Sequence, residues 1–271
     1  MSYDEYVGRS QTATDEVAPR LLAGLAATLG VETPTTLPPL WHWMLFQEWV
    51  PPDRIGPDGH PKRGGFLPPV HDLPRRMWAG GRLRWQGKLK AGDPVRRTST
   101  IARVQEKQGG AGRLVFVTVR HVIEGPSGPA IEEEQDLVYR GTEGAAVKPA
   151  PAATDRLGPG EGISATVRPD PVMLFRYSAL TGNGHRIHYD LDYVRDVEGY
   201  PGLIVHGPLQ ATLLAGLVQG RPLRSFDFRG LRPAFHGRLL TLEARPGPEG
   251  AALRTLDEEG AVCMQASVVL A

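Results

Sequence analysis

The chain has 271 residues, of which 33 are glycine and 25 are proline. Together these make up about a fifth of the chain, more than the usual ~12%, yet the 41% of hydrophobic residues suffices for a packed core. A net charge of +1 excludes a general attraction to nucleic acid or anionic membranes. The apolar runs are too short for a membrane-spanning helix. A single cysteine, Cys263, excludes a disulfide framework and a cysteine zinc site. The polar N-terminus has no signal-peptide core, so we expect a cytoplasmic protein.

The first half of the chain predicts a helix followed by strands. Asp15 is a typical N-cap, apolar residues follow at helical spacing over 17–29, and Gly30 is a stop signal. The aromatic segment 37–50 predicts a buried helix, and the proline- and glycine-rich segment 51–74 predicts a loop. Four segments with the β-branched content of an antiparallel sheet come next: 82–89, 94–105, 114–124 and 135–139.

A connector divides the chain into two halves. Segment 141–162 is rich in alanine, proline and glycine and has no hydrophobic period, so it predicts an exposed linker between domains over 1–140 and 163–271. The second half predicts, in chain order, a strand at 165–167, a turn region at 177–182, a short helix at 191–197 and an apolar helix at 206–219 that begins with Gly-Pro. Three strands close the chain, at 225–231, 237–244 and 261–270.

Both halves thus predict a buried helix followed by antiparallel strands. A single apolar helix wrapped by an antiparallel sheet is the hot-dog arrangement. Two of them in tandem give an α+β chain with a double hot-dog fold, which is the fold class that we predict.

The densest group of functional side chains lies in FRYSALTGNGHRIHYDLDY, residues 175–193. It includes Asn183, His185 and His188, and an imidazole with an amide nearby can hold and deprotonate a water. Further along, Gly207 and Pro208 begin the apolar helix. A helix start of this kind offers unpaired N–H groups and a positive dipole end to a developing oxyanion.

Simpler interpretations compete with chemistry for these residues. His185 and His188 could hold a metal, but they lie three positions apart in a glycine-rich loop without a zinc signature, so we expect no metal. Asp190 fits an N-cap of the helix at 191–197 better than a catalytic acid. For His188 we favour chemistry, because in an extended segment it points away from its apolar neighbours Ile187 and Tyr189.

At these residues the sequence resembles a known family. YSALTGNGHRIHYD and YPGLIVHGPLQATLL resemble the hydratase signature of the MaoC-like enoyl-thioester hydratases and dehydratases. The closer resemblance is to their double hot-dog branch, with mesaconyl-C4-CoA hydratases, itaconyl-CoA hydratases and hydroxyacyl-thioester dehydratases type 2. LPPLWHWMLF and RRMWAGGRL in the first half resemble the N-terminal domain of that branch, so the resemblance covers most of the chain.

The resemblance implies roles for individual residues. His188 occupies the position of the family's histidine, and Asn183 stands where the wider family has an aspartate, so His188 is implied as general base and Asn183 as the residue that orients the water. The backbone N–H of Gly207 is implied to hold the thioester carbonyl. We expect substrate contacts from four further residues: Tyr177, His185, Arg186 and His206.

Two expectations concern charge on the substrate. Arg186 could pair with the free carboxylate of a dicarboxylic monothioester, or could only form a salt bridge with Asp190 or Asp192. Three arginines of the first half could meet a phosphate of CoA: Arg75, Arg76 and Arg82.

The resemblance therefore implies a lyase that adds water to an α,β-unsaturated acyl-CoA, mesaconyl-C4-CoA or itaconyl-CoA, to give citramalyl-CoA. The alternatives are a 3-hydroxyacyl-thioester dehydratase of fatty-acid synthesis, acting on CoA or carrier-protein thioesters, and a non-catalytic acyl-thioester binding protein. No cofactor is implied. We expect the N-terminal half to shape the acyl tunnel without catalytic residues, and a homodimer is compatible with the sequence.

Overall fold

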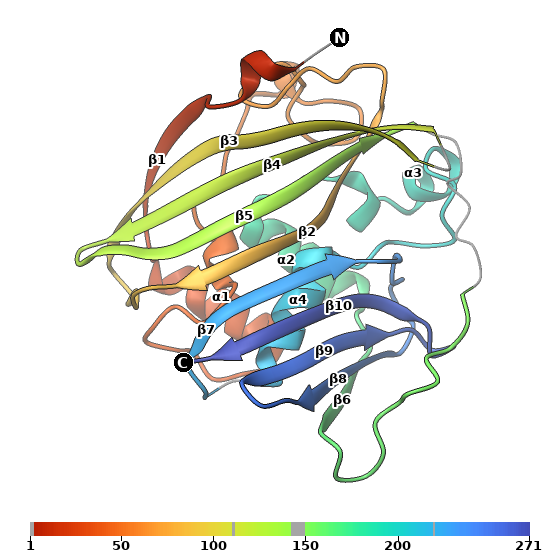
Figure 1. The fold of residues 1–271 in the computed structure, drawn as a ribbon. Coiled ribbons are helices and arrows are strands. Elements are labelled where there is room, and N and C mark those ends of the chain that lie inside the picture. The colour runs from red at the N-terminus through yellow and green to blue at the C-terminus, as the bar shows by residue number, and fades with distance from the viewer. Residues whose placement is uncertain (1–2, 110–111, 142–149, 219) are drawn as a thin grey trace.

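The structure is a computed structural model that describes residues 3–109, 112–141, 150–218 and 220–271. Within these residues five strands come from the first half: β1 Ser10–Glu16, β2 Arg75–Trp85, β3 Pro94–Gly109, β4 Gly112–Gly125 and β5 Gly128–Arg140. Five come from the second half: β6 Ile163–Val167, β7 Leu223–Gly230, β8 Leu240–Pro246, β9 Gly250–Leu256 and β10 Val262–Leu270. All ten join one antiparallel sheet, in the order β1-β3-β4-β5-β2-β7-β10-β9-β8-β6 (Figure 1).

The two halves of the sheet mirror each other. Counted inwards from its edges, the order β1-β3-β4-β5-β2 repeats as β6-β8-β9-β10-β7, and the halves meet where β2 pairs with β7. Gly80 lies at this seam, and a Cβ there would stand 2.4 Å from the carbonyl oxygen of Phe228, so only glycine allows the strands to approach. The sheet therefore joins both halves into one continuous core.

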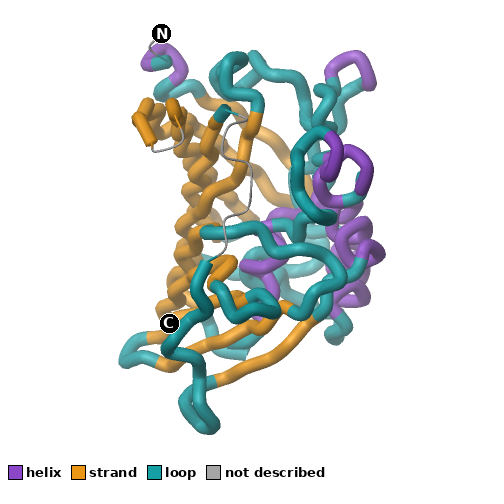
Figure 2. The backbone as a smooth tube through the Cα atoms, turned by 90° about the vertical axis from the view of Figure 1, so that its right-hand side faces the viewer, coloured by secondary structure: helices purple, strands orange, loops and turns teal. Residues whose placement is uncertain are grey.

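Four α-helices are found in the described residues: α1 Pro19–Leu29, α2 Pro171–Thr181, α3 Leu191–Asp196 and α4 Gly207–Gly216. The helices α1, α2 and α4 lie on one face of the sheet (Figures 1 and 2). Leu209 and Leu214 of α4 are fully buried, as a helix that is apolar on all sides requires. The predicted apolar helix of the second half is thus the central one.

The predicted start of the first helix was wrong. Asp15 lies in β1, and α1 begins only at Pro19, after the extended residue Ala18. The Asp15 carboxylate instead accepts a hydrogen bond from the N–H of Phe46, at 2.6 Å. The predicted end at Gly30 is confirmed, because this residue adopts φ 69°, the left-handed conformation of a helix stop.

The helix predicted over 37–50 was also wrong. Only a single 3₁₀ turn forms there, η2 Trp41–Met44, between Leu40 and Phe46, which both have positive φ. The prediction that the segment is buried is confirmed, since Trp41 and Met44 belong to the core. Side-chain contacts with the sheet, rather than helical hydrogen bonds, fix the position of this segment.

Glu133 of β5 provides the main polar contact with that segment. Its carboxylate, 2% exposed, accepts hydrogen bonds from His42 Nε2 at 3.0 Å and Trp43 Nε1 at 2.9 Å. Burial by itself raises the pKa of Glu133. The hydrogen bonds and charges of its neighbours, His42 first among them, have the larger combined effect and lower the pKa to about 2. The carboxylate is therefore ionised and paired in the core.

Glu133→Ala is expected to lower the free energy of unfolding by about 3–5 kcal/mol, because a removed partner leaves the buried N–H groups of His42 and Trp43 unpaired. Chemical denaturation measures the loss. Glu132→Ala on the same strand is the control, since its pair with Arg120 is at the surface and should contribute less than about 1 kcal/mol. Equal losses in the two variants would contradict the importance of the buried network.

The second half adds two elements that the sequence analysis missed. Residues 177–182, predicted as a turn region, are the end of α2 and its stop residue Gly182. β9 was not among the predicted strands, although a hairpin through residues 245–250 was predicted. The other predicted strands and the short helix are present with shifted ends. Residues 142–149 of the predicted linker lie outside the described residues. The remainder of the linker packs along β8 and β9. There Arg254 of β9 forms a salt bridge with the Asp155 carboxylate, at 2.7 Å.

No helix in the described part of the chain is long and apolar enough to cross a membrane.

Candidate active site

The loop that follows α2 is shaped by its own side chains. Gly182 ends the helix with φ 62°, and the Asn183 N–H returns to the carbonyl of Ser178 at 2.9 Å. The side-chain oxygen of Asn183 accepts the N–H of His185 at 3.0 Å, which is an Asx turn. Asp190 caps α3 by accepting the N–H of Tyr193, as predicted. The amide oxygen of Asn183 is therefore used within the loop, and its NH₂ group is the part left to act on a ligand.

The His188 imidazole is fixed in one orientation and one tautomer. It lies in the 3₁₀ turn η4 Arg186–His188 and is 6% exposed. Its Nδ1 stands 2.7 Å from the carbonyl oxygen of Ile204. A carbonyl can only accept, so Nδ1 carries the hydrogen and Nε2 keeps a free lone pair. This is the arrangement that a general base requires.

His206 supports the His188 ring from behind. The two imidazoles stack with centroids 3.6 Å apart and planes 19° apart. His206 is fully buried, with Nε2 2.8 Å from the Ser178 hydroxyl and its ring 5.0 Å from that of Tyr177. Two residues predicted to contact substrate, Tyr177 and His206, thus lie in the core behind His188.

The start of α4 is next to this stack, because His206 is its N-cap residue. The His206 side chain makes no capping hydrogen bond, and the helix begins with Gly207 and Pro208. The first N–H groups of a helix have no partner within it. Gly207, next to the His206 residue that stacks on His188, therefore presents a donor and the positive end of the helix dipole, and its contact with a thioester stays a prediction.

Arg186 forms the salt bridge with Asp190 that was one of its two alternatives. Its guanidinium donates two hydrogen bonds to Asp190, at 2.9 and 2.7 Å, and a third to the carbonyl of Pro57 at 3.0 Å. Its guanidinium carbon also lies over the Tyr193 ring, 4.2 Å from the ring centroid. These contacts favour the salt bridge with Asp190, and the pairing of Arg186 with a substrate carboxylate stays a prediction.

Sequence reasoning missed two residues of the site, Asp58 and His60. Both lie in the predicted loop 51–74, which packs on the loop after α2. The His60 ring is 4.2 Å from that of His185, which in turn is 5.6 Å from that of His188. His60 Nδ1 is 3.0 Å from the Asp58 carboxylate, so Nδ1 donates and Nε2 is free. The Asp-Gly-His pattern was a signal, but nothing local relates it to residues 183–188.

The contact between the two loops is close. The N–H of Arg186 donates to the carbonyl of Asp58 at 2.9 Å. A Cβ on Gly59, which has φ +89°, would stand 1.9 Å from the carbonyl oxygen of Gly184. Glycine at position 59 is therefore required for His60 to reach His185.

Burial keeps the imidazoles of the site neutral. It lowers the pKa of His188 to about 4 and that of His185 to about 2, and it places the pKa of His206 well below the ordinary value. Burial also lowers the pKa of His60, although the bond to Asp58 opposes it. At neutral pH the site therefore holds free imidazole bases.

Asp58, His60 and His185 place one donor atom each within 4.8 Å of one another. One carboxylate and two imidazoles form a donor set that zinc accepts. His188 is outside this group, so the His185–His188 pair considered from the sequence is not brought together as a metal site in the described residues.

The arginines predicted to meet CoA phosphate differ in their surroundings. Arg75 pairs with Glu198 at 3.1 Å, and Arg82 holds both Glu134 and Asp136. Arg76 takes part in none of the salt bridges found among the described residues. It is thus the one of the three without a carboxylate partner among the described residues.

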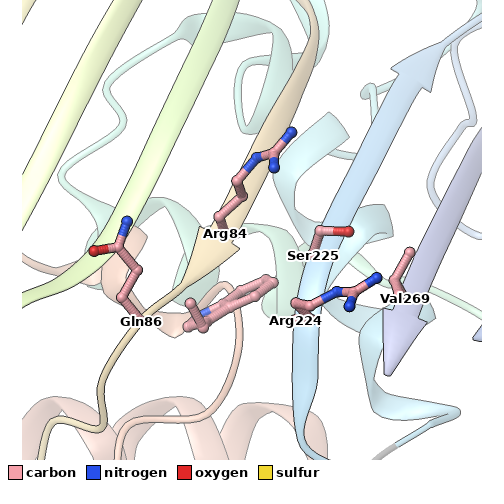
Figure 3. A pocket seen from close by; sticks show the side chains of 6 residues that line it. Arg84, Gln86, Arg224, Ser225 and Val269 are labelled. Carbon is pink, nitrogen blue, oxygen red and sulfur yellow. The ribbon is translucent and has the colours of Figure 1, made fainter. Parts of the chain in front are cut away.

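A surface pocket of about 450 Å³ lies elsewhere, between the end of β2 and the start of β7 (Figure 3). It is lined by Arg84, Trp85, Gln86, Arg224, Ser225 and Val269. A Cβ on Gly207 would meet Met264 at 3.9 Å, and Met264 pairs with Gly230 at the opposite end of β7. This pocket is therefore separate from the histidines.

Comparison with solved structures identifies the fold. A MaoC-like dehydratase from Phytophthora capsici matches with a TM-score of 0.75 at 16% identity, over 100% of this chain and 99% of its own. A Mycobacterium tuberculosis protein with a double hotdog fold matches with a TM-score of 0.56 at 13% identity, over 100% and 98% of the two chains. The predicted double hot-dog fold is confirmed.

Sequence comparison then identifies the family. The model of the family Hydroxyacyl-thioester dehydratase type 2 matches residues 40–236. The chain belongs to this family. The predicted resemblance and the prediction of a hydratase or dehydratase enzyme are thereby confirmed.

Two curated relatives place the chain within the hydroxyacyl-thioester dehydratase type 2 family. The mesaconyl-C(4)-CoA hydratase of Chloroflexus aurantiacus is 43% identical over 98% of this chain and 96% of its own length. The mitochondrial hydroxyacyl-thioester dehydratase type 2 of Schizosaccharomyces pombe is 27% identical over 74% and 75% of the two chains. Similarity to the hydratase is thus higher and extends over nearly the whole chain.

Proposed function

We propose that this protein hydrates mesaconyl-C4-CoA to citramalyl-CoA. The observation that carries the proposal is 43% identity to a mesaconyl-C(4)-CoA hydratase over 98% of the chain. The free Nε2 of His188 beside the start of α4 is the arrangement that the reaction needs. The runner-up is the dehydration of 3-hydroxyacyl thioesters, which the family name and the relative from yeast support.

The mechanism uses two groups of the site, the Gly207 N–H and His188 Nε2. The thioester carbonyl accepts a hydrogen bond from the Gly207 N–H, so that charge can develop there as an enolate. His188 Nε2 takes a proton from water, the hydroxide adds to the β-carbon, and the imidazolium returns the proton to the α-carbon. The Asn183 NH₂ group donates to the oxygen of that water. Dehydration is the same path reversed.

Tyr177 and His206 have a positioning role in this proposal, because they are buried behind His188. They hold the ring through the stack and through Ser178. In this proposal the general base comes from the half over 163–271, as expected. The half over 1–140 does more than shape a tunnel, because its residue His60 lies against His185.

Hydration assays with mesaconyl-C4-CoA, itaconyl-CoA and crotonyl-CoA, followed by loss of the enoyl-thioester absorbance, test the proposed function. We expect mesaconyl-C4-CoA to have the highest kcat/KM. Turnover of crotonyl-CoA alone would refute the dicarboxylic substrate and favour the dehydratase.

Asn183→Asp is expected to keep activity within about tenfold of wild type, because one carboxylate oxygen can accept the His185 N–H and hold the turn while the other holds the water by accepting its O–H in place of the amide donor. Asn183→Leu removes both the turn and the contact with water, and should lose roughly 10²-fold or more. Steady-state kinetics with circular dichroism as a folding check compares the two. An inactive but folded Asn183→Asp would mean that the amide donor itself is required.

The acid limb of kcat/KM is expected near pH 4. A general base acts only when unprotonated, and burial lowers the pKa of His188 from 6.5 to about 4. Activity should therefore persist below pH 6.5 and be lost as the pH falls through about 4. A pH–rate profile, with circular dichroism at each pH to separate unfolding, measures the limb. An acid limb near pH 6.5 would be evidence of a base exposed to solvent.

The proposal also includes a cellular location and an oligomeric state. A cytoplasmic location is supported by the single, buried cysteine. A homodimer is supported by α2, which exposes Val172 and Phe175 by 61% and 63%. Analytical ultracentrifugation tests the dimer.

A further inference from the structure

The proposed substrate carries its free carboxylate on the carbon that is attacked. In mesaconyl-C4-CoA the carboxylate and a methyl group are both bonded to the β-carbon, to which hydroxide adds. The carboxylate thus lies a single bond from the reacting atom. Because His188 activates the water that attacks this atom, the groups that recognise the carboxylate must lie beside His188. This inference rests on the proposed function.

The arginine predicted for this task already has partners within the protein. Arg186 uses its guanidinium on Asp190, Pro57 and the Tyr193 ring. Arg75 and Arg82 are paired with carboxylates of the protein. The substrate carboxylate therefore needs other partners.

Two half-buried imidazoles, those of His185 and His60, lie next to one another on one side of His188. The His185 ring is 5.6 Å from His188, and the His60 ring is 4.2 Å from His185. Asp58 accepts from His60 Nδ1 and also, at 3.1 Å, from the backbone N–H of His60, so it fixes both the ring and the backbone of this residue. Its Nε2 is left for a ligand. His60 is therefore a preorganised group of the site that no step of the hydration uses.

Positive charge lies behind these two rings. Arg76 is on β2 opposite Tyr139 of β5 and has no carboxylate partner among the described residues. Burial is the main cause of the lowered pKa of His60 and of His185, and the charge of Arg76 adds to it in both. The charge of Arg63 also acts on His60. The Asp58 carboxylate opposes this effect on both rings, but two arginine charges against one carboxylate leave the surroundings net positive, which favours an anion.

We propose that His60 and His185 bind the free carboxylate of the substrate, with Asp58 holding His60 and Arg76 supplying positive charge. A carboxylate against Nε2 stabilises the imidazolium form of His60, in which Nδ1–H is donated to Asp58 and Nε2–H to the substrate. A hydrogen bond between two charged groups is about twice as strong as a neutral one. The N-terminal half thus selects the dicarboxylic substrate, while the C-terminal half provides the general base.

A metal ion is the rival occupant of the same residues. Asp58, His60 and His185 have the donor atoms for one. The Asp58 carboxylate attracts a cation, but the nearby charges of Arg63 and Arg76 repel it and outnumber that one carboxylate, whereas they attract a substrate carboxylate. The observations therefore favour the anion.

Binding of two saturated thioesters tests the proposal. Succinyl-CoA has a carboxylate on its β-carbon, and butyryl-CoA has a methyl group in the same place, so the ratio of their Kd values measures recognition of the carboxylate. By isothermal titration calorimetry we expect wild type to prefer succinyl-CoA by roughly 10- to 100-fold, as a charged hydrogen bond provides. His60→Ala should lose most of this preference and leave butyryl-CoA binding within about threefold.

Arg76→Met is the second variant, and it should reduce the same preference if His60→Ala fails to fold. His71→Ala is the matched control, since His71 is exposed in the same loop. An unchanged preference in folded His60→Ala and Arg76→Met would overturn the proposal, as would equal weakening of both ligands. So would zinc that copurifies with wild type and is lost in His60→Ala. If wild type hydrates no mesaconyl-C4-CoA, the proposed function fails instead.

Discussion

His188→Ala is expected to lower kcat by about 10²- to 10⁴-fold and to leave KM within about threefold, because general base catalysis contributes in that range. The Nε2 lone pair is the group removed. The substrate is held by other atoms, the Gly207 N–H and the CoA contacts, so binding should change little. Steady-state hydration kinetics on mesaconyl-C4-CoA measure both constants.

The matched control for His188 is His71→Ala, an exposed histidine of the first half that should behave as wild type. His188→Gln separates chemistry from packing, because its amide nitrogen can still donate to Ile204 while it cannot serve as a base. Wild-type turnover in folded His188→Ala would remove this residue from the mechanism.

Gly59→Ala is expected to lower kcat/KM by about 10²-fold, since a displacement of about 1 Å in a catalytic group has an effect of that size. The added Cβ would stand 1.9 Å from the Gly184 carbonyl oxygen, and a backbone atom cannot move aside as a side chain can. The two loops must separate. His60 then leaves His185, and the Asx turn that precedes His188 loses its support.

Gly92→Ala is the control for backbone strain. Gly92 has φ +87°, nearly that of Gly59, and a Cβ there would meet nothing within 4 Å. Both variants should lose about 1–3 kcal/mol of stability from the unfavourable φ, measured by chemical denaturation. Only Gly59→Ala should lose activity. Equal activity in the two variants would contradict the need for contact between the loops.

The sequence predicted the parts of the fold that short-range patterns control. The strands β3 and β4 were found because they are rich in β-branched residues. β1 was missed because its polar and mostly exposed residues carry no such alternation. α2 was missed although Asp170 caps it and Pro171 stands at its first turn, which are ordinary signals of a helix start.

The segment 37–50 shows where local signals fail. Its apolar content predicts burial equally well for a helix and for an irregular segment. The hydrogen bonds of Glu133 and Asp15 select the irregular form, and both residues are distant in sequence from the segment that they hold. Tertiary contacts override helix propensity here.

The candidate site divides in the same way. By itself the sequence determined the loop around Asn183, the cap at Asp190 and the helix start at Gly207, because these depend on partners two or three residues away. It also determined the family. Only the tertiary structure decided that Arg186 is taken by Asp190 and Pro57, that His206 stacks behind His188, and that His60 lies against His185. These contacts join residues up to 129 positions apart, and their partners become neighbours only when the two halves close on one sheet.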